Sequence, residues 1–257
     1  MITITLPGND KKQYDKPVTS AEIANDISEK LKSDALVSIV NGELWDLDRP
    51  IEIDSKIAIL TKKNRETLDI IRHDAAHIMA EAVLELFPET QVTIGPSIEN
   101  GFYYDFYREK KFILSDLEII EKRMHEIVDR DETISREVWS REKAIDHFKK
   151  NNEKFKLELV KAIPEDETVT FYRQGRFLDL CRGPHTCSTK KLGHSFKLTK
   201  LAGSYWRGDS KNQVLQRIYG TAFFNDKDLK DYLFMIEEAE KRDHRKLGKE
   251  LNLFHLQ

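Results

Sequence analysis

The first sixty or so residues alternate short apolar segments with one helical stretch. Ile2, Ile4 and Leu6 alternate with polar residues, which is typical of a half-buried strand, and the turn residues 7–10 follow. Residues 19–31 open with a capping sequence and carry apolar side chains at helical spacing, which predicts one helix. Further strands are predicted over 36–40, 43–47 and 56–61.

This order of elements predicts a small ubiquitin-like β-grasp domain over residues 1–62, followed by a larger α+β domain over 63–224. In the larger domain, helices are predicted at 66–86, 115–130 and 140–152. Strands are predicted at 92–94, 101–106, 133–139, 169–172, 177–180 and 214–222. A last amphipathic helix is predicted from Asp226 to Leu251, so residues 225–257 are interpreted as a linker helix. The pattern breaks off at Phe254–Gln257, and we expect a longer parent protein.

Composition and charge narrow the class of protein. Hydrophobic residues make up 39% of the 257, which is enough for packed cores, and the net charge of -3 excludes a wholly basic nucleic-acid-binding protein. No apolar run approaches the ~18 residues that a membrane span needs, so no membrane contact is expected. Two cysteines cannot form a disulfide framework, which predicts a reduced, cytoplasmic protein.

One segment departs from this charge balance. Residues 173–220 contain ten Lys or Arg against Asp179 and Asp209, a formal +8, and aromatic residues lie between them. Cations neutralise phosphates and aromatic rings stack on bases, which indicates an RNA-binding surface with Lys197, Lys200 and Arg207 as candidate contacts. A solvated surface with the aromatic residues in the core is the alternative.

Two pairs of side chains carry candidate chemistry. His73 and His77 stand four apart on one face of the predicted helix, and Cys181 and His185 repeat this spacing around a Gly-Pro turn, with Asp179 nearby. The four could ligate Zn²⁺, or form a metal-free hydrolytic pocket that polarises a water. A metalloprotease is less favoured, because an Asp stands where a zincin has its Glu base. Structural roles, with Cys181 as a small buried hydrophobe, stay open as well.

Longer strings identify a family resemblance. IIRHDAAHIMAEAV, IGPSIENGFYYDF, FLDLCRGPH, KLTKLAGSYWRGDSKNQVLQRIYGTAF and EAEKRDHRKLGKELNLFHLQ resemble the N-terminal part of bacterial threonyl-tRNA synthetases, across essentially the whole chain. The resemblance implies a TGS domain, an editing domain (the second additional domain) and a helix that leads to a class II core outside this chain. ATP, Mg²⁺ and Zn²⁺ would belong to that core, through which the parent would form a homodimer.

The resemblance also implies an activity. Serine is threonine without one methyl group, and the contacts of one methylene give only about 1–3 kcal/mol of discrimination, so a second pocket that admits serine is needed. The editing domain would hydrolyse Ser-tRNA(Thr), and its partner would be the acceptor end of tRNA(Thr) carrying serine. A tRNA-binding module without hydrolytic activity of its own is the alternative.

By this resemblance the catalytic residues are His73, His77, Lys156, Asp179, Cys181 and His185. Tyr104, Gly95 and Arg182 would contact the substrate. Lys156 and His185 would meet the ribose or ester oxygen. His73 and Asp179 would hold the seryl amine or hydroxyl, and Cys181 and His77 would help confine the water. The related alanyl-tRNA synthetase editing domain binds zinc with a similar set, whereas the threonyl branch is metal-free, so no metal or other cofactor is expected in this chain.

Overall fold

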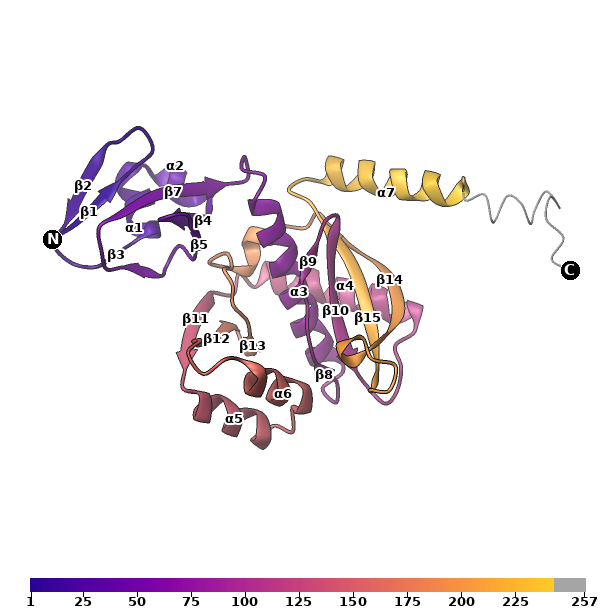
Figure 1. Cartoon of the computed structure of the whole chain (residues 1–257). Coiled ribbons are helices and arrows are strands. Elements are labelled where there is room, and N and C mark those ends of the chain that lie inside the picture. Colours follow the sequence, from indigo (N-terminus) through magenta and orange to yellow (C-terminus); the bar gives the residue numbers. More distant parts are fainter. Residues whose placement is uncertain (243–257) are drawn as a thin grey trace, which may run out of the picture.

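The N-terminal part is built on a five-stranded sheet. The structure is a computed structural model that describes residues 1–242, and Figure 1 shows this sheet on the left. Its strand order is β2-β1-β7-β4-β5, with β1 and β7 parallel and the other pairs antiparallel. The strands are β1 (Ile2–Thr5), β2 (Lys11–Tyr14), β4 (Ala35–Val40), β5 (Glu43–Trp45) and β7 (Ser55–Thr61), and β3 (Val18–Thr19) pairs with β6 (Pro50–Ile51) beside them.

The prediction of a single helix over residues 19–31 is wrong. The chain forms α1 (Ser20–Ile27) and α2 (Glu29–Asp34), separated by Ser28. Ser28 has extended backbone angles (φ -170°, ψ 148°), and its side chain accepts a hydrogen bond from the amide of Leu31 at 3.1 Å. A serine in this role begins a new helix instead of continuing the old one, because its oxygen replaces a missing backbone acceptor.

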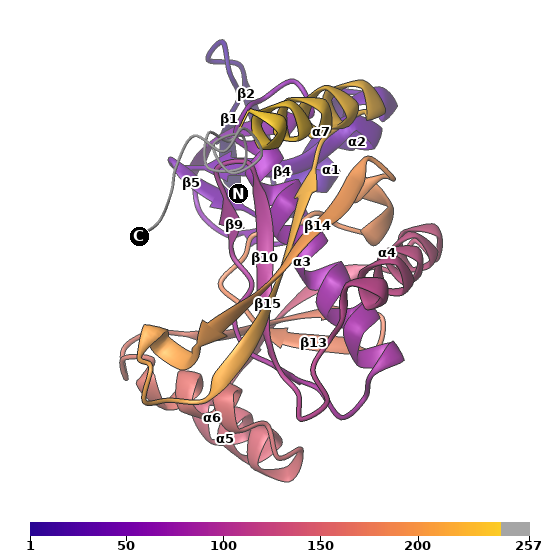
Figure 2. The same ribbon diagram turned by 90° about the vertical axis from the view of Figure 1, so that its right-hand side faces the viewer.

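The larger part contains a second sheet covered on one face by two helices. The sheet order is β14-β15-β10-β8, with β9 pairing to β10, and α3 and α4 pack against it (Figure 2). Its elements are α3 (Thr67–Leu86), β8 (Gln91–Val92), β9 (Ser97–Ile98), β10 (Gly101–Tyr107), α4 (Leu114–Asp129), β14 (Phe196–Tyr205) and β15 (Val214–Ala222). Strand β14 is absent from the predicted strands, and its pairing with β15 shifts register between Leu198 and Lys200.

A third, three-stranded sheet carries the remaining helices. Its order is β11-β12-β13, and α5 and α6 pack on it through an apolar cluster that includes Phe148, Val160 and Phe171. The elements are β11 (Ile134–Trp139), α5 (Arg141–Lys150), α6 (Lys154–Ala162), β12 (Val169–Gln174) and β13 (Phe177–Leu180), and the short helices η1 (Thr189–Leu192) and η2 (Trp206–Gly208) lie in later connections. The α+β class is confirmed, although α6 was not predicted.

The last described element is α7 (Asp226–Lys241), which begins where the sequence predicted a helix. The remainder of that prediction, to Leu251, and the final residues Phe254–Gln257 lie outside the described residues. Within residues 1–242, no helix is both long and apolar enough to cross a bilayer.

Candidate functional site

Four separate parts of the chain bring the predicted residues to one cavity. The cavity has a volume of about 370 Å³, within the usual range for small-molecule sites. Helix α3 contributes two histidines and α6 contributes the lysine, the connection between β8 and β9 contributes a glycine, and β13 with the loop after it contributes the rest. The predicted residues that line it are His73, His77, Gly95, Lys156, Asp179, Cys181 and Arg182. Tyr104 and His185 are also close, but both are buried behind the lining.

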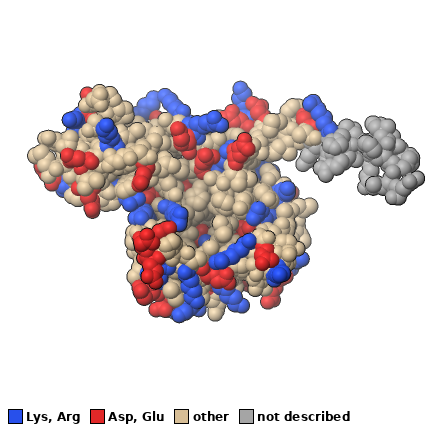
Figure 3. Space-filling model, viewed as in Figure 1, with Lys and Arg blue, Asp and Glu red and all other residues tan. Residues whose placement is uncertain are grey.

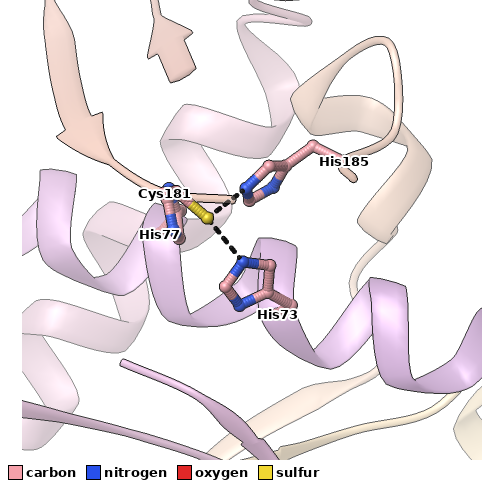
Figure 4. A group of neighbouring side chains, drawn as sticks. All are labelled: His73, His77, Cys181 and His185. Atoms are coloured by element: carbon pink, nitrogen blue, oxygen red, sulfur yellow. Dashed lines mark hydrogen bonds between the residues drawn. The ribbon is translucent and has the colours of Figure 1, made fainter. Parts of the chain in front are cut away.

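The sulfur of Cys181 lies at the centre of the histidine cluster (Figure 4). Its Sγ is 3.0 Å from Nε2 of His73 and 3.3 Å from Nε2 of His185, and the amide of Gly183 donates to it at 3.3 Å. His77 lies against both other histidines, with ring centroids 4.8 Å from His73 and 4.3 Å from His185. The two sequence pairs are therefore one cluster.

Charge separation stabilises this cluster. Burial by itself would raise the pKa of the Cys181 thiol, but the charges of His185 and His73 and their hydrogen bonds outweigh it and lower that pKa well below its usual range. Burial opposes the charged form of His185 too, yet Cys181 and Asp74 raise its pKa to about 10. Both shifts favour a thiolate on Cys181 beside a protonated His185.

Asp74 is a site residue that sequence reasoning missed. Its Oδ1 lies 2.7 Å from Nδ1 of His185, and its Oδ2 accepts from the Thr186 hydroxyl at 2.5 Å. Both carboxylate oxygens are thus occupied and buried away from the cavity, so Asp74 cannot serve as the water-activating base of a metalloprotease. No local pattern in the sequence indicates this role, because the partner His185 lies 111 residues further along the chain.

A buried ion pair forms another part of the wall. Lys156 and Asp179, each 2% exposed, are in direct contact, and the Tyr104 hydroxyl donates to Oδ2 of Asp179 at 2.6 Å. Lys156 Nζ also donates to that hydroxyl at 3.2 Å. Burial and the Asp179 carboxylate raise the pKa of Tyr104 well above its usual value, so its hydroxyl stays protonated and remains a donor.

The predicted contact Gly95 lies against the ring of Tyr104. A Cβ at position 95 would lie 2.0 Å from that ring, which explains the glycine there.

The predicted substrate contact Arg182 lies at the mouth of the cavity. Its side chain is 82% exposed, and Nη2 is 2.6 Å from Oε2 of Glu167, which also lines the cavity. The guanidinium is therefore accessible to a ligand that enters from solvent.

The histidine cluster also has the donors that zinc prefers. His73, His77, Cys181 and His185 each offer one ligand atom, and these atoms lie within 4.8 Å of one another. A tetrahedral zinc site with bonds of roughly 2.0–2.3 Å spaces its ligand atoms by roughly 3.3–3.8 Å. The four residues fit the ion by donor type, although the 3.0 Å between Cys181 Sγ and His73 Nε2 is shorter than this spacing.

The cations of the basic segment 173–220 are distributed over several elements of the fold. Its residues belong to two sheets and their connections, and both signs of charge are interspersed on the face shown in Figure 3. Six of its ten cations have an acidic partner from outside the segment, namely Arg173–Glu137, Arg182–Glu167, Lys190–Asp131, Lys197–Glu121, Arg207–Glu158 and Arg217–Asp105. The local excess of +8 is thus largely balanced in three dimensions.

Comparison with known proteins gives matches over the whole chain. Residues 2–61 match the TGS domain, and residues 169–219 match the threonyl and alanyl tRNA synthetase second additional domain. All of this chain aligns with threonine–tRNA ligases, at 57% identity for those of Rickettsia bellii and Paramagnetospirillum magneticum and 55% for that of Maricaulis maris. The chain spans about 40% of the length of these relatives, at their N-terminal end.

Proposed function

Since the chain belongs to the threonyl-tRNA synthetase family, we propose that it hydrolyses the ester bond of tRNA(Thr) mischarged with serine. In this proposal residues 1–62 are the TGS domain and 63–224 the editing domain, and α7 (Asp226–Lys241) belongs to a linker toward the catalytic core. Ligation of threonine to tRNA(Thr), with its ATP and metal requirements and its dimer, would belong to the longer parent.

The convergence of reactive groups on one cavity carries the proposal. Two histidines, a thiolate and a buried Lys156–Asp179 pair face about 370 Å³ of space. A surface that only binds RNA needs exposed cations for phosphates and has no use for buried charges beside a thiolate. The arrangement therefore favours a hydrolase over a binding module.

In this proposal some side chains of the cavity bind the substrate and another activates the water. The Asp179 carboxylate suits the positively charged seryl amine, and Lys156 can donate to the ribose or ester oxygen. Burial and the charge on His185 lower the pKa of His77, which keeps its imidazole neutral and able to accept a proton from water. That water adds to the ester carbonyl carbon, and the ribose oxygen leaves with a proton as serine is released.

The burial of His185 changes the role expected for it. At 2% exposure it lies behind Cys181 and outside the cavity lining, so we assign it to orienting Cys181, not to contact with the ester. His73 stays at the cavity wall, where it can contact the seryl side chain.

Deacylation of paired substrates tests the proposal. The 257-residue chain should release serine from Ser-tRNA(Thr) much faster than threonine from Thr-tRNA(Thr), and His73→Ala should slow serine release. The matched control is His194→Ala, a histidine that is exposed and outside the site. If the chain binds tRNA(Thr) but hydrolyses neither ester, the binding module is the correct function.

We further propose that this reaction needs no zinc. The Cys181 sulfur already has hydrogen-bond contacts with His73 and His185. The raised pKa of His185 also favours a proton on its ring, and a metal ion would have to displace that proton to bind the nitrogen. The purified chain should contain far less than one zinc per molecule by elemental analysis, and chelators should leave deacylation unchanged. Stoichiometric zinc, with activity lost to chelator and restored by the metal, would show the opposite.

A further inference from the structure

We propose that Asp46, in the N-terminal sheet domain, is a positioning residue for the editing pocket. Its carboxylate fixes the Cys181–His185 loop, defined as residues 181–185, so the N-terminal domain completes the site. The effect on deacylation rests on the proposed function, whereas the effect on the loop does not.

Asp46 contacts two parts of the pocket at once. Its Oδ1 accepts a hydrogen bond from the backbone amide of His185 at 3.0 Å. The Tyr172 hydroxyl donates to the same carboxylate, at 3.0 Å to Oδ1 and 2.9 Å to Oδ2. These partners are 139 and 126 residues away in the sequence, so one carboxylate joins the N-terminal domain to the loop and to β12.

The turn that presents Asp46 is held firmly by its own contacts. The Trp45 indole donates to the Arg49 carbonyl at 3.2 Å, and the Arg49 guanidinium lies 3.3 Å above the Trp45 ring. The Leu47 carbonyl accepts from the amide of Ala21 at 3.0 Å, which ties the turn to α1. A carboxylate on such a turn is a fixed anchor, and little entropy is lost when it binds the loop.

Tyr172 forms the opposite side of this junction. Its buried ring lies 4.3 Å from the His185 ring, centroid to centroid. Gly183 has φ +70°, and a Cβ there would lie 1.9 Å from the Tyr172 hydroxyl, so the loop backbone packs directly over that group. The Asp46 carboxylate thus binds the loop backbone and the Tyr172 hydroxyl where these two groups are in contact.

His185 is held by two carboxylates from different domains. Asp46 binds its backbone amide, and Asp74 on α3 binds its imidazole at 2.7 Å. The same imidazole contacts the Cys181 sulfur at 3.3 Å. Release of the amide would therefore let His185 move and disturb the sulfur that lines the cavity.

The N-terminal domain does not depend on Asp46 for its attachment. Val37 and Leu60 of its sheet pack with Ile70 of α3 in one apolar cluster, and Lys191 Nζ donates to the Ser33 carbonyl at 2.6 Å. Loss of the Asp46 carboxylate should thus loosen the loop while the domains stay together.

The test compares Asp46→Ala and Asp46→Asn in the whole chain. Hydrogen exchange at the His185 amide reports the loop, and kcat and KM for Ser-tRNA(Thr) report the pocket. Asp46→Ala should raise the exchange rate and lower kcat, each about tenfold, with KM nearly unchanged. Asp46→Asn keeps an acceptor oxygen and should recover most of both. The control Asp54→Ala removes an acceptor of the Thr3 amide inside the N-terminal sheet, and should leave the loop exchange at the wild-type rate.

Two results would overturn the proposal. One is wild-type exchange at His185 in Asp46→Ala, because the carboxylate then does not hold the loop. The other is faster exchange with unchanged kcat, because the loop then needs no fixing. If the wild-type chain hydrolyses no Ser-tRNA(Thr), the proposed function fails. The exchange rates together with alkylation of Cys181, followed by mass spectrometry, then decide whether Asp46 orders the pocket.

Discussion

At the scale of single residues, Lys156 and Asp179 set opposite charges inside the cavity wall. Removal of one partner leaves the other charge buried and uncompensated, which costs about 3–5 kcal/mol. We expect Lys156→Ala to lower the free energy of unfolding by about that amount in urea titrations. It should also slow hydrolysis of the serine and threonine esters alike, because Lys156 addresses atoms that both esters share.

A double variant separates the two effects of Lys156. Lys156→Met with Asp179→Asn removes both charges and should regain most of the lost stability, since a neutral pair avoids the cost of desolvating two ions. Activity should stay low in the double variant. Recovery of wild-type deacylation together with stability would mean that the pair is only structural.

His73 should influence selectivity as well as rate. Its imidazole lies at the cavity wall beside Cys181, where it could both contact the seryl side chain and exclude a methyl group. His73→Ala should slow serine release about tenfold or more, and should raise the rate for Thr-tRNA(Thr) relative to that for Ser-tRNA(Thr) because space opens. Serine release at the wild-type rate would make His73 a packing residue.

Sequence reasoning found those site residues that have a local pattern. The four-residue spacings of His73 with His77 and of Cys181 with His185 were visible in the sequence, whereas Lys156 was found only through the family resemblance. Asp46 and Asp74 were missed. Their partner His185 is 139 and 111 residues away, and contacts of that range have no local signature.

At the scale of one element, α3 carries two glutamates whose ionisation has opposite effects on the free energy of unfolding. Burial raises the pKa of Glu81 to about 8, whereas hydrogen bonds from Arg130 lower that of Glu85 to about 2. Between pH 4.5 and 8 the folded chain therefore holds a proton on Glu81 that the unfolded chain has lost, and stability falls as pH rises. Glu81→Gln should remove this penalty, a gain on the order of 2 to 4 kcal/mol at pH 8 and little at pH 4.5.

Glu85→Gln is the matched control for Glu81→Gln. A lowered pKa contributes stability above pH 4.5 that is lost as pH falls toward 2, so this variant should be less stable at neutral pH and approach wild type in acid. Thermal unfolding across pH 3–9 measures both variants. Parallel wild-type and Glu81→Gln curves would show that Glu81 does not titrate in this window.

The elements also differ in how well their sequences reveal them. Helix α3 was predicted within one residue, because its apolar positions keep helical spacing over 20 residues. Helix α6 has only nine residues and was missed, as was β14, whose pairing shifts register between Leu198 and Lys200. Short or irregular elements are stabilised by tertiary packing, which the local pattern does not contain.

At the scale of the whole molecule, charge pairing decides which cations can meet RNA. Lys197 is 2.7 Å from Glu121, and Arg207 is 3.9 Å from Glu158. Lys200 instead lies 5.0 Å above the Tyr219 ring. Among residues 1–242 no ion pair engages Lys200, so its charge is the most available of the three candidates.

This difference predicts a graded response of tRNA binding to salt. A cation that contacts a phosphate releases counterions, and its loss reduces the slope of log K against log salt by about 1. Lys200→Ala should therefore weaken tRNA(Thr) binding and flatten the slope by about 1, whereas Lys197→Ala should change the slope less because Glu121 already neutralises that charge. Replacing Lys200 and Arg207 together should have the largest effect of the pairs. The measurement is the affinity of each variant for tRNA(Thr), and its slope against salt, from 50 to 300 mM salt. If all variants follow the wild-type line, the cations of this segment form a solvated surface, and the tRNA must be held by other parts of the protein.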